Sequence, residues 1–337
     1  GSEMCIRDSS NTPWVNDAES ETLRMSRLST LIEKENAEKT IAGQIKELSA
    51  LQTAEGGWSW CPDMQPSTYI TRSVLSQFAS LTRSGALTAF PSAEPMIKSA
   101  IRYVDDETWK DYTKYHKKDE SLSWLLDWLY VRSSFDKALL PSGVLARNLS
   151  PVYAKAEKDI AKEWKNLDIR DKALAALLLW RSGNRKTALD ILESLTQFAS
   201  VSPEKGVWFD NLDAPYGNAS TLQTTTSVLQ AFSEIQPDNK IVDGLRQWLV
   251  LSRQVQDWGK QRSTVETVDA ILTSGTDWTN AARTDIPEFR LKGQRVQTPQ
   301  SAVLTGAFTL TLDAGRASGK TLKITRSAPA PAWGGVI

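Results

Sequence analysis

The chain has 337 residues, of which 40% are hydrophobic and 24% charged, as expected for a globular protein with one large domain or two smaller ones. Lysine plus arginine and aspartate plus glutamate both number 40, so no net positive charge exists to attract nucleic acid. Two cysteines, Cys5 and Cys61, and one histidine, His116, are too few for a four-ligand zinc site, and we expect no cofactor or metal. No apolar run is long enough to span a membrane.

Most of the chain has the pattern of helices. Residues 1–10 show neither a signal peptide nor a folded element, and we interpret them as a cloning or assembly remnant. From there on, apolar residues recur at helical spacing between short Gly, Pro and Asn breaks. Helices are expected around 28–32, 41–51, 73–78, 94–104, 122–129, 152–164, 171–180, 187–198, 220–235, 241–251 and 263–272. The segment 171–180 is apolar on most faces, which predicts an inner helix, whereas 187–198 is amphipathic and predicts an outer one.

A tryptophan beside glycine recurs ahead of Ser/Thr-rich helix starts. Its turn residues are Gln52, Gly56, Gly57 and Trp58 in the first copy, Gly206 and Trp208 in the second, and Trp258 and Gly259 in the third. One helical hairpin cannot bury its apolar face alone, so repeated hairpins stack or close on themselves. Alternating inner and outer helices, about a dozen in all, predict a mainly α protein, an α/α toroid over residues 11–280. An open helical repeat scaffold for protein interactions is the alternative.

The pattern changes to that of strands near the C-terminal end. Residues 308–312 and 321–325 alternate with period two around an expected turn at 313–320, and Phe289 and Leu291 precede them. Residues 281–337 are therefore predicted to be the first strands of a truncated antiparallel β-sandwich.

Few residues suggest catalysis. Asp210, Asp213 and Tyr216 share a long loop and are the best candidates for a toroid polysaccharide lyase or glycoside hydrolase, which needs paired carboxylates. The run 52–58 fits the turn Q-x-x-x-G-x-W of terpene cyclases, but the acidic group 105–107 lacks the further spaced aspartate of their catalytic acid. We assign no catalytic, cofactor or metal residue and expect no enzyme activity, with the lyase or hydrolase as the alternative.

Several segments, taken in order, resemble the bacterial alpha-2-macroglobulin-like family of the Bacteroidetes envelope type. They are Asn11 to Thr22, Gln52 to Trp60, Tyr69-Ile70-Thr71, Arg262 to Thr267 and Ala330 to Gly335. The first is similar to the family's "TPWV" segment, the second to its "GGW" turn and the last to its "AWG" strand. The resemblance covers about residues 11–337.

The resemblance implies that the toroid is the family's thioester-bearing domain. There, a Cys–Gln thioester in a C-x-E-Q motif captures proteases covalently. This chain has no such motif, because Cys61 lacks the following Glu-Gln pair, and the motif is expected upstream of Asn11.

The resemblance further implies a fragment of an endopeptidase inhibitor of the cell envelope, with a protease-trapping or envelope-defence role. The implied partners are proteases and the remaining macroglobulin domains. The implied location is the periplasm, with a lipid anchor through the N-terminal part of the protein.

Overall fold

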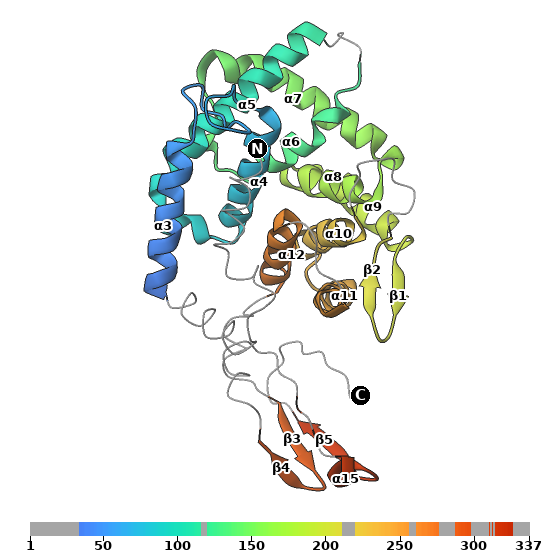
Figure 1. Cartoon of the computed structure of the whole chain (residues 1–337). Coiled ribbons are helices and arrows are strands. Elements are labelled where there is room, and N and C mark those ends of the chain that lie inside the picture. The colour runs from blue at the N-terminus through green and yellow to red at the C-terminus, as the bar shows by residue number, and fades with distance from the viewer. Residues whose placement is uncertain are drawn as a thin grey trace. The chain divides into compact units, whose positions relative to one another are not determined.

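A computed structural model of the protein describes residues 34–115, 120–210, 220–255, 261–275, 287–297, 310, 312 and 314–325. The described part is mainly helical, with a few short antiparallel strands (Figure 1). The chain divides into two compact units, Glu47–Thr276 and a second that joins Gly1–Lys46 to Asp277–Ile337. The predicted division into 11–280 and 281–337 differs in placing residues 11–46 with the helices, and it stays a prediction.

The longer helices follow one another along most of the chain. Their bounds are α3 Lys34–Ala50, α4 Thr68–Arg83, α5 Glu94–Tyr115, α6 Leu126–Arg132, α7 Gly143–Glu163, α8 Ile169–Arg181, α9 Arg185–Thr196, α10 Thr221–Ile235, α11 Ile241–Val255 and α12 Gln261–Thr273. Short 3₁₀ helices lie between some of them: η1 Ala86–Ala89, η2 Pro91–Ala93, η3 Ser123–Leu125, η4 Lys137–Leu139 and η5 Trp164–Asn166.

Helix starts are fixed by side-chain caps. The Asp168 carboxylate accepts a hydrogen bond from the Asp171 N–H at the start of α8, and Ser220 and Gln223 form a reciprocal capping box at the start of α10. All residues from 173 to 179 of α8 are buried, which confirms the predicted burial of this helix on most faces. Helix α9 buries one stripe and leaves the opposite face polar, which confirms its predicted amphipathic character.

Alternate helices of the unit 47–276 contact one another in turn. Helix α4 packs on α6, α6 on α8, α8 on α10, α10 on α12, and α12 on α4. The intervening helices pack against this series, α5 on α4 and α7, α9 on α8, and α11 on α10 (Figure 1). Large buried side chains such as Trp128, Phe209 and Phe232 fill the space between the helices.

Two small sheets complete the described structure. Strands β1 (Ser200–Ser202) and β2 (Gly206–Trp208) form an antiparallel hairpin in which Val201 pairs with Val207. The second sheet has the antiparallel order β4 (Gln294–Val296), β3 (Glu288–Leu291), β5 (Leu322–Thr325). Strand β5 confirms the strand predicted at 321–325, whereas the remainder of a β-sandwich stays a prediction.

Three predicted elements differ from the structure, and two others lie wholly or mostly outside the described residues. The predicted turn at 313–320 contains one helical turn, α15 (Ala314–Ala317). Helix α7 begins at Gly143 and not at Val152, because the helix tolerates Pro151 in its interior at the loss of one backbone hydrogen bond. The segment predicted as a helix at 122–129 begins as the 3₁₀ helix η3 and becomes α-helical only at Leu126. The expected helix at 28–32 and most of the strand at 308–312 lie outside the described residues.

Candidate functional site

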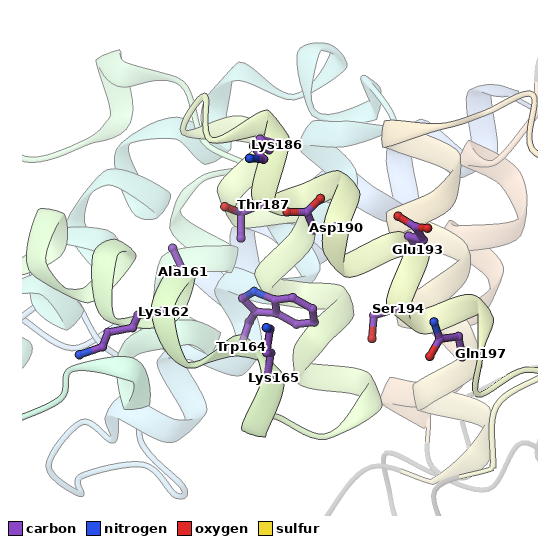
Figure 2. Close-up of a pocket in the computed structure, with 10 residues that line it drawn as sticks. All are labelled: Ala161, Lys162, Trp164, Lys165, Lys186, Thr187, Asp190, Glu193, Ser194 and Gln197. Carbon is purple, nitrogen blue, oxygen red and sulfur yellow. The ribbon is translucent and has the colours of Figure 1, made fainter.

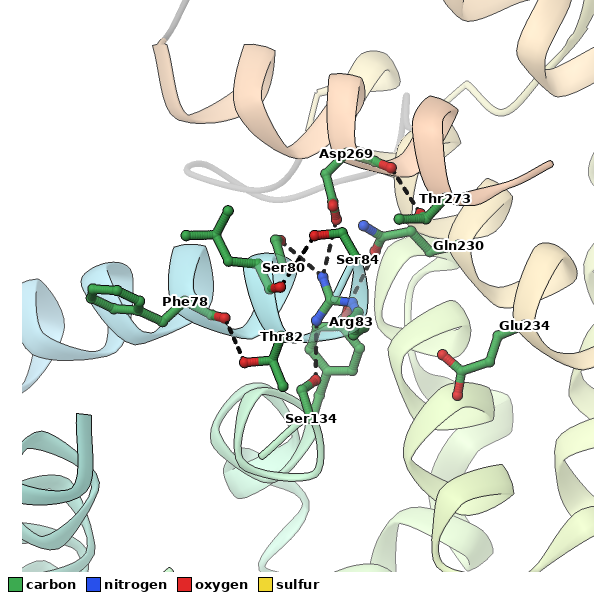
Figure 3. A network of polar contacts seen from close by, with 12 residues as sticks. Phe78, Ser80, Thr82, Arg83, Ser84, Ser134, Gln230, Glu234, Asp269 and Thr273 are labelled. Carbon is green, nitrogen blue, oxygen red and sulfur yellow. Dashed lines mark hydrogen bonds and ion pairs between the residues drawn. The ribbon is translucent and has the colours of Figure 1, made fainter. Parts of the chain in front are cut away.

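Polar side chains from five helices meet within the unit 47–276. This inter-helix polar cluster consists of Arg83 of α4, Tyr130 of α6, Arg181 of α8, Gln230 and Glu234 of α10, and Asp269 of α12 (Figure 3). Its helices are the five that contact one another in turn. Carboxylates beside a tyrosine and partly shielded by neighbouring helices are what an acid–base enzyme would need, so the cluster is the first place to look for catalysis.

Arg83 connects α4 with α6 and α12. Its guanidinium donates to the hydroxyls of Ser134 and Ser80, at 3.0 and 2.9 Å, and to the carboxylate of Asp269 at 3.4 Å (Figure 3). The same guanidinium lies 5.8 Å from the centre of the Tyr130 ring. One side chain thus holds the ends of three helices together.

Arg181 makes the corresponding connection from α8. It binds the Glu234 carboxylate through two N–H groups, Nε at 2.7 Å and Nη2 at 2.6 Å, and donates to the hydroxyls of Ser133 and Ser134. Its guanidinium lies 5.2 Å from the centre of the Tyr130 ring, whose own hydroxyl donates to Gln230 at 3.0 Å. Tyr130 therefore contacts both arginines.

The electrostatics of the cluster favour a structural role over catalysis. Burial raises the pKa of Asp269, and the Arg83 guanidinium opposes that rise. Each of the two carboxylates, Asp269 and Glu234, is paired with an arginine. A general acid or nucleophile needs a carboxylate free to exchange its proton or attack a substrate, and arginine pairing disfavours both.

The two arginines belong to a longer regularity of the chain. Arg83, Arg132 and Arg181 end α4, α6 and α8, each is followed by serine, and they are spaced 49 residues apart. The identical tripeptide Arg-Ser-Gly at 83–85 and 181–183 is the sequence signal that could have found it, and Gly85 and Gly183 adopt positive φ there, as helix-ending glycines do. The 49 residues from one of these arginines to the next contain two α-helices, α5 and α6 in the first interval and α7 and α8 in the second.

Arg132 belongs to a second buried group around Asp105. The fully buried Asp105 carboxylate accepts hydrogen bonds from the Tyr153 hydroxyl at 2.6 Å and the Trp128 indole at 3.0 Å, and it pairs with Arg132. Burial raises the pKa of Asp105, and Arg132 and the hydrogen bonds oppose the rise. Burial and the Asp105 charge raise the pKa of Tyr153. These contacts join α5, α6 and α7, and they occupy the Asp105 carboxylate with three partners.

The acidic run 105–107 is divided by the structure. Asp106 and Glu107 both bind the exposed ammonium of Lys110 within α5, at 2.8 and 2.7 Å. Asp105, in contrast, is fully buried and pairs with Arg132. The three carboxylates therefore do not form one acidic centre.

Asp210 holds the β-hairpin together. Its carboxylate accepts hydrogen bonds from the Trp208 indole and the Ser200 hydroxyl, both at 3.0 Å. Asp213 and Tyr216, the other residues considered for catalysis in this loop, lie outside the described residues. The described contacts of Asp210 link the two strands, and none of them is to a second carboxylate.

The first tryptophan–glycine turn is tied to three helices. The Trp58 indole donates to the carbonyl of Leu48 in α3, and the Trp58 N–H donates to the Thr71 hydroxyl in α4. The Gln52 amide donates to the carbonyls of Gly56 and Met96, the latter in α5. A Cβ on Gly56 would lie 2.5 Å from the Ser99 hydroxyl of α5, and one on Gly57 would lie 2.8 Å from the Tyr103 ring.

The second copy reproduces part of this arrangement with a β-hairpin in place of a turn. Gly206 and Trp208 lie in strand β2 and not in a turn, and the residue whose N–H donates to a helix threonine, Thr225, is Phe209. Gly206 packs against Gly244 of α11, as Gly56 packs against α5. The Trp208 ring stacks on Trp248. The third copy, Trp258 and Gly259, lies outside the described residues.

Metal and thiol chemistry find little support in the residues described. No group of three or more His, Cys, Asp and Glu side chains that could hold a metal is found among them. Cys61 is a free, exposed cysteine, and His116 lies outside the described residues.

No protein-family model matches the chain, and none of the curated proteins compared with it is significantly similar. Among the described helices, none combines the length and the apolar character needed to cross a membrane.

Proposed function

We propose that this chain contains an α/α toroid of the macroglobulin thioester-domain type and that it acts by binding, as part of a protease-trapping protein of the cell envelope. The proposed toroid has α4, α6, α8, α10 and α12 as its inner helices and α5, α7, α9 and α11 as its outer ones. The observation that carries the proposal is the contact of α12 with α4, which links the last inner helix to the first.

Three further observations support the toroid. The arginines that end α4, α6 and α8 recur at the spacing of one inner and one outer helix. Gly56 precedes the proposed inner helix α4 and packs on the outer helix α5. Gly206 likewise precedes α10 and packs on α11. The pair Arg83–Asp269 bridges α4 and α12. An open repeat scaffold gives no reason for this last contact.

The binding role is supported by the state of the carboxylates. In the alternative enzyme, a polysaccharide lyase or glycoside hydrolase, a pair of carboxylates faces the substrate. Here Glu234 and Asp269 are each held by an arginine, and Asp105 is enclosed by Arg132, Tyr153 and Trp128.

The closure of the ring is testable by charge reversal. Arg83→Asp and Asp269→Arg each place like charges at the contact between α4 and α12 and should lower the melting temperature. The double variant restores opposite charges and should recover part of the loss, because the pair interacts directly. Losses that simply add in the double variant would contradict the contact.

The protease-trapping role is tested on the full-length protein encoded by the gene. The protein is incubated with trypsin, and cleavage of casein is compared with cleavage of a small chromogenic peptide. An enclosed protease still admits the peptide, so casein cleavage should fall about tenfold while peptide cleavage persists. Unchanged cleavage of casein would reject trapping, and release of reducing ends from polysaccharides would favour the enzyme. A methylamine-sensitive covalent conjugate would reveal a thioester elsewhere in the protein.

A further inference from the structure

A groove lies on the outside of the unit 47–276, between the C-terminal end of α7 with η5 and the polar face of α9 (Figure 2). Its volume is about 630 Å³. The groove exists because the outer helices are packed unequally. Helices α5 and α7 pack directly on each other, whereas α9 packs mainly on α8.

The centre of the groove is an aromatic ring. The indole of Trp164 lies between the end of α7 and α9, with Asp190 beyond one edge of it and Gln197 beyond another (Figure 2). Trp164 is only half-buried, and the ammonium of Lys165 lies 5.8 Å from its ring centre. The ring is the one large apolar surface among the residues that line this groove.

Charged groups of both signs surround the ring without neutralising one another. Lys162, Lys165 and Lys186 line the groove together with Asp190 and Glu193, and the Lys162 side chain is directed away from the Trp164 ring (Figure 2). Within the described residues, none of the three lysines comes within ion-pair distance of either carboxylate. The groove therefore presents donor-only ammonium groups and acceptor-only carboxylates that are separated by open space.

These features restrict the chemistry of a ligand. A phosphorylated or other anionic ligand would meet the carboxylates of Asp190 and Glu193, and an apolar ligand would cover charged groups without pairing them. A hydroxyl both donates and accepts, so a polyhydroxyl ligand can satisfy the lysines and the carboxylates together. The C–H face of a sugar ring supplies the apolar surface that matches the indole of Trp164.

We propose that this groove binds a short neutral oligosaccharide, with one sugar ring stacked on Trp164 and its hydroxyls bonded to Asp190, Glu193 and Lys186. The proposal concerns a site on the outer helices and is independent of the protease-trapping role. It also differs from the enzyme alternative, because Asp190 and Glu193 both belong to α9 and line the same side of the groove.

Saturation-transfer-difference NMR on the whole chain tests the site, with cellobiose, maltose and N,N′-diacetylchitobiose as probes and glucose 6-phosphate as the anionic comparison. At least one neutral disaccharide should receive magnetisation at millimolar concentration, and more strongly than glucose 6-phosphate. Trp164→Ala should lower the affinity at least tenfold, and Asp190→Ala together with Glu193→Ala by a similar factor.

The matched control is Trp60→Ala, because Trp60 is a more exposed tryptophan that stacks on Tyr69 and does not line the groove. Its binding should equal that of the unaltered protein. Circular dichroism shows whether each variant is folded. The absence of saturation transfer to all three disaccharides would overturn the proposal, and so would binding that survives Trp164→Ala but disappears with Trp60→Ala.

Discussion

The two described copies of the tryptophan–glycine repeat use different backbones to make the same connection. In the first copy a turn carries Gly56 and Trp58, and in the second a β-hairpin carries Gly206 and Phe209. Both glycines have positive φ, 94° and 88°. Gly56 lies against α5 and Gly206 against α11, in each case the second α-helix that follows the glycine in the chain. What is kept is the close approach of a glycine to a helix, α5 or α11, whereas the tryptophan two residues later makes different contacts in the two copies.

The backbone N–H group that bonds to a helix threonine belongs to the tryptophan in the first copy and to the residue after the tryptophan in the second. The Trp58 N–H donates to Thr71 and the Phe209 N–H to Thr225, both at 3.0 Å. Both donors belong to buried aromatic residues, whereas Trp208 is only half-buried and its indole bonds to Asp210. A repeat aligned on tryptophan thus keeps Gly56 and Gly206 in register but places the two N–H donors one position apart.

The largest expected effect is that of Gly206→Ala. A Cβ there would collide with the carbonyl oxygen of Gly244, and φ is 88°, so we expect a loss of about 3–5 kcal/mol in the free energy of unfolding. Gly56→Ala should cost a similar amount, since its Cβ would lie 2.7 Å from the Ser99 carbonyl oxygen. Urea unfolding followed by circular dichroism gives both values.

Gly85→Ala is the control for backbone strain alone. Gly85 has φ of 74°, and nothing lies within 4 Å of the position that an added methyl group would take, so only about 1–2 kcal/mol should be lost. Equal losses at Gly85, Gly56 and Gly206 would show that close packing plays no part in the repeat.

The next effect concerns the two threonines. Thr71→Val and Thr225→Val keep the side-chain shape and remove the acceptor for a buried N–H, so each should cost about 1–3 kcal/mol. Thr→Ser at either position keeps the hydroxyl and should retain most of the stability. If only Thr71→Val destabilises the protein, the proposed correspondence of Trp58 with Phe209 is wrong. Exposed Thr113→Val serves as the neutral control.

The two tryptophans should differ. Trp58→Phe removes a bond to the Leu48 carbonyl in a side chain that is 3% exposed, and we expect a loss of about 2–3 kcal/mol. Trp208→Phe removes a bond to Asp210 in a half-buried setting and should cost about 1 kcal/mol. Urea unfolding of the two variants measures both losses. A larger loss for Trp208→Phe would indicate that Trp208, and not Phe209, corresponds to Trp58.

The smallest effect is expected for Asp210→Asn. The amide oxygen of asparagine can still accept from the Trp208 indole or the Ser200 hydroxyl, so at most about 1 kcal/mol should be lost. The first copy has no corresponding carboxylate between two strands. A loss as large as that of Thr225→Val would mean that the hairpin, and not the glycine contact, holds the second copy in place.

Much of the helical pattern was predictable because it depends on local periodicity. The segment 173–179 is apolar at nearly every position, and a helix apolar on most faces must be covered on most faces. The β-hairpin was not predictable from Gly206-Val207-Trp208, since each strand has only three residues and local sequence gives little evidence for strands that short. The start of α7 was misplaced because Pro151 usually marks a boundary.

The candidate site was less predictable than the helices. The spacing of Arg83, Arg132 and Arg181 was readable, but spacing alone does not reveal which carboxylate each arginine meets. Arg83 meets Asp269, 186 residues away in sequence, and Arg132 meets Asp105, 27 residues away. Long-range partners of this kind depend on how the helices pack.

The sequence by itself determined the helical character of the chain, the burial of α8 on most faces and the amphipathic character of α9, because these follow from side-chain size and apolar periodicity. Only the tertiary structure decided that the second copy is a hairpin, that Phe209 replaces Trp58 in its hydrogen bond to a helix threonine, and that every carboxylate of the inter-helix polar cluster is paired with an arginine. These outcomes depend on contacts between segments far apart in the chain, whose free energies do not enter any local pattern.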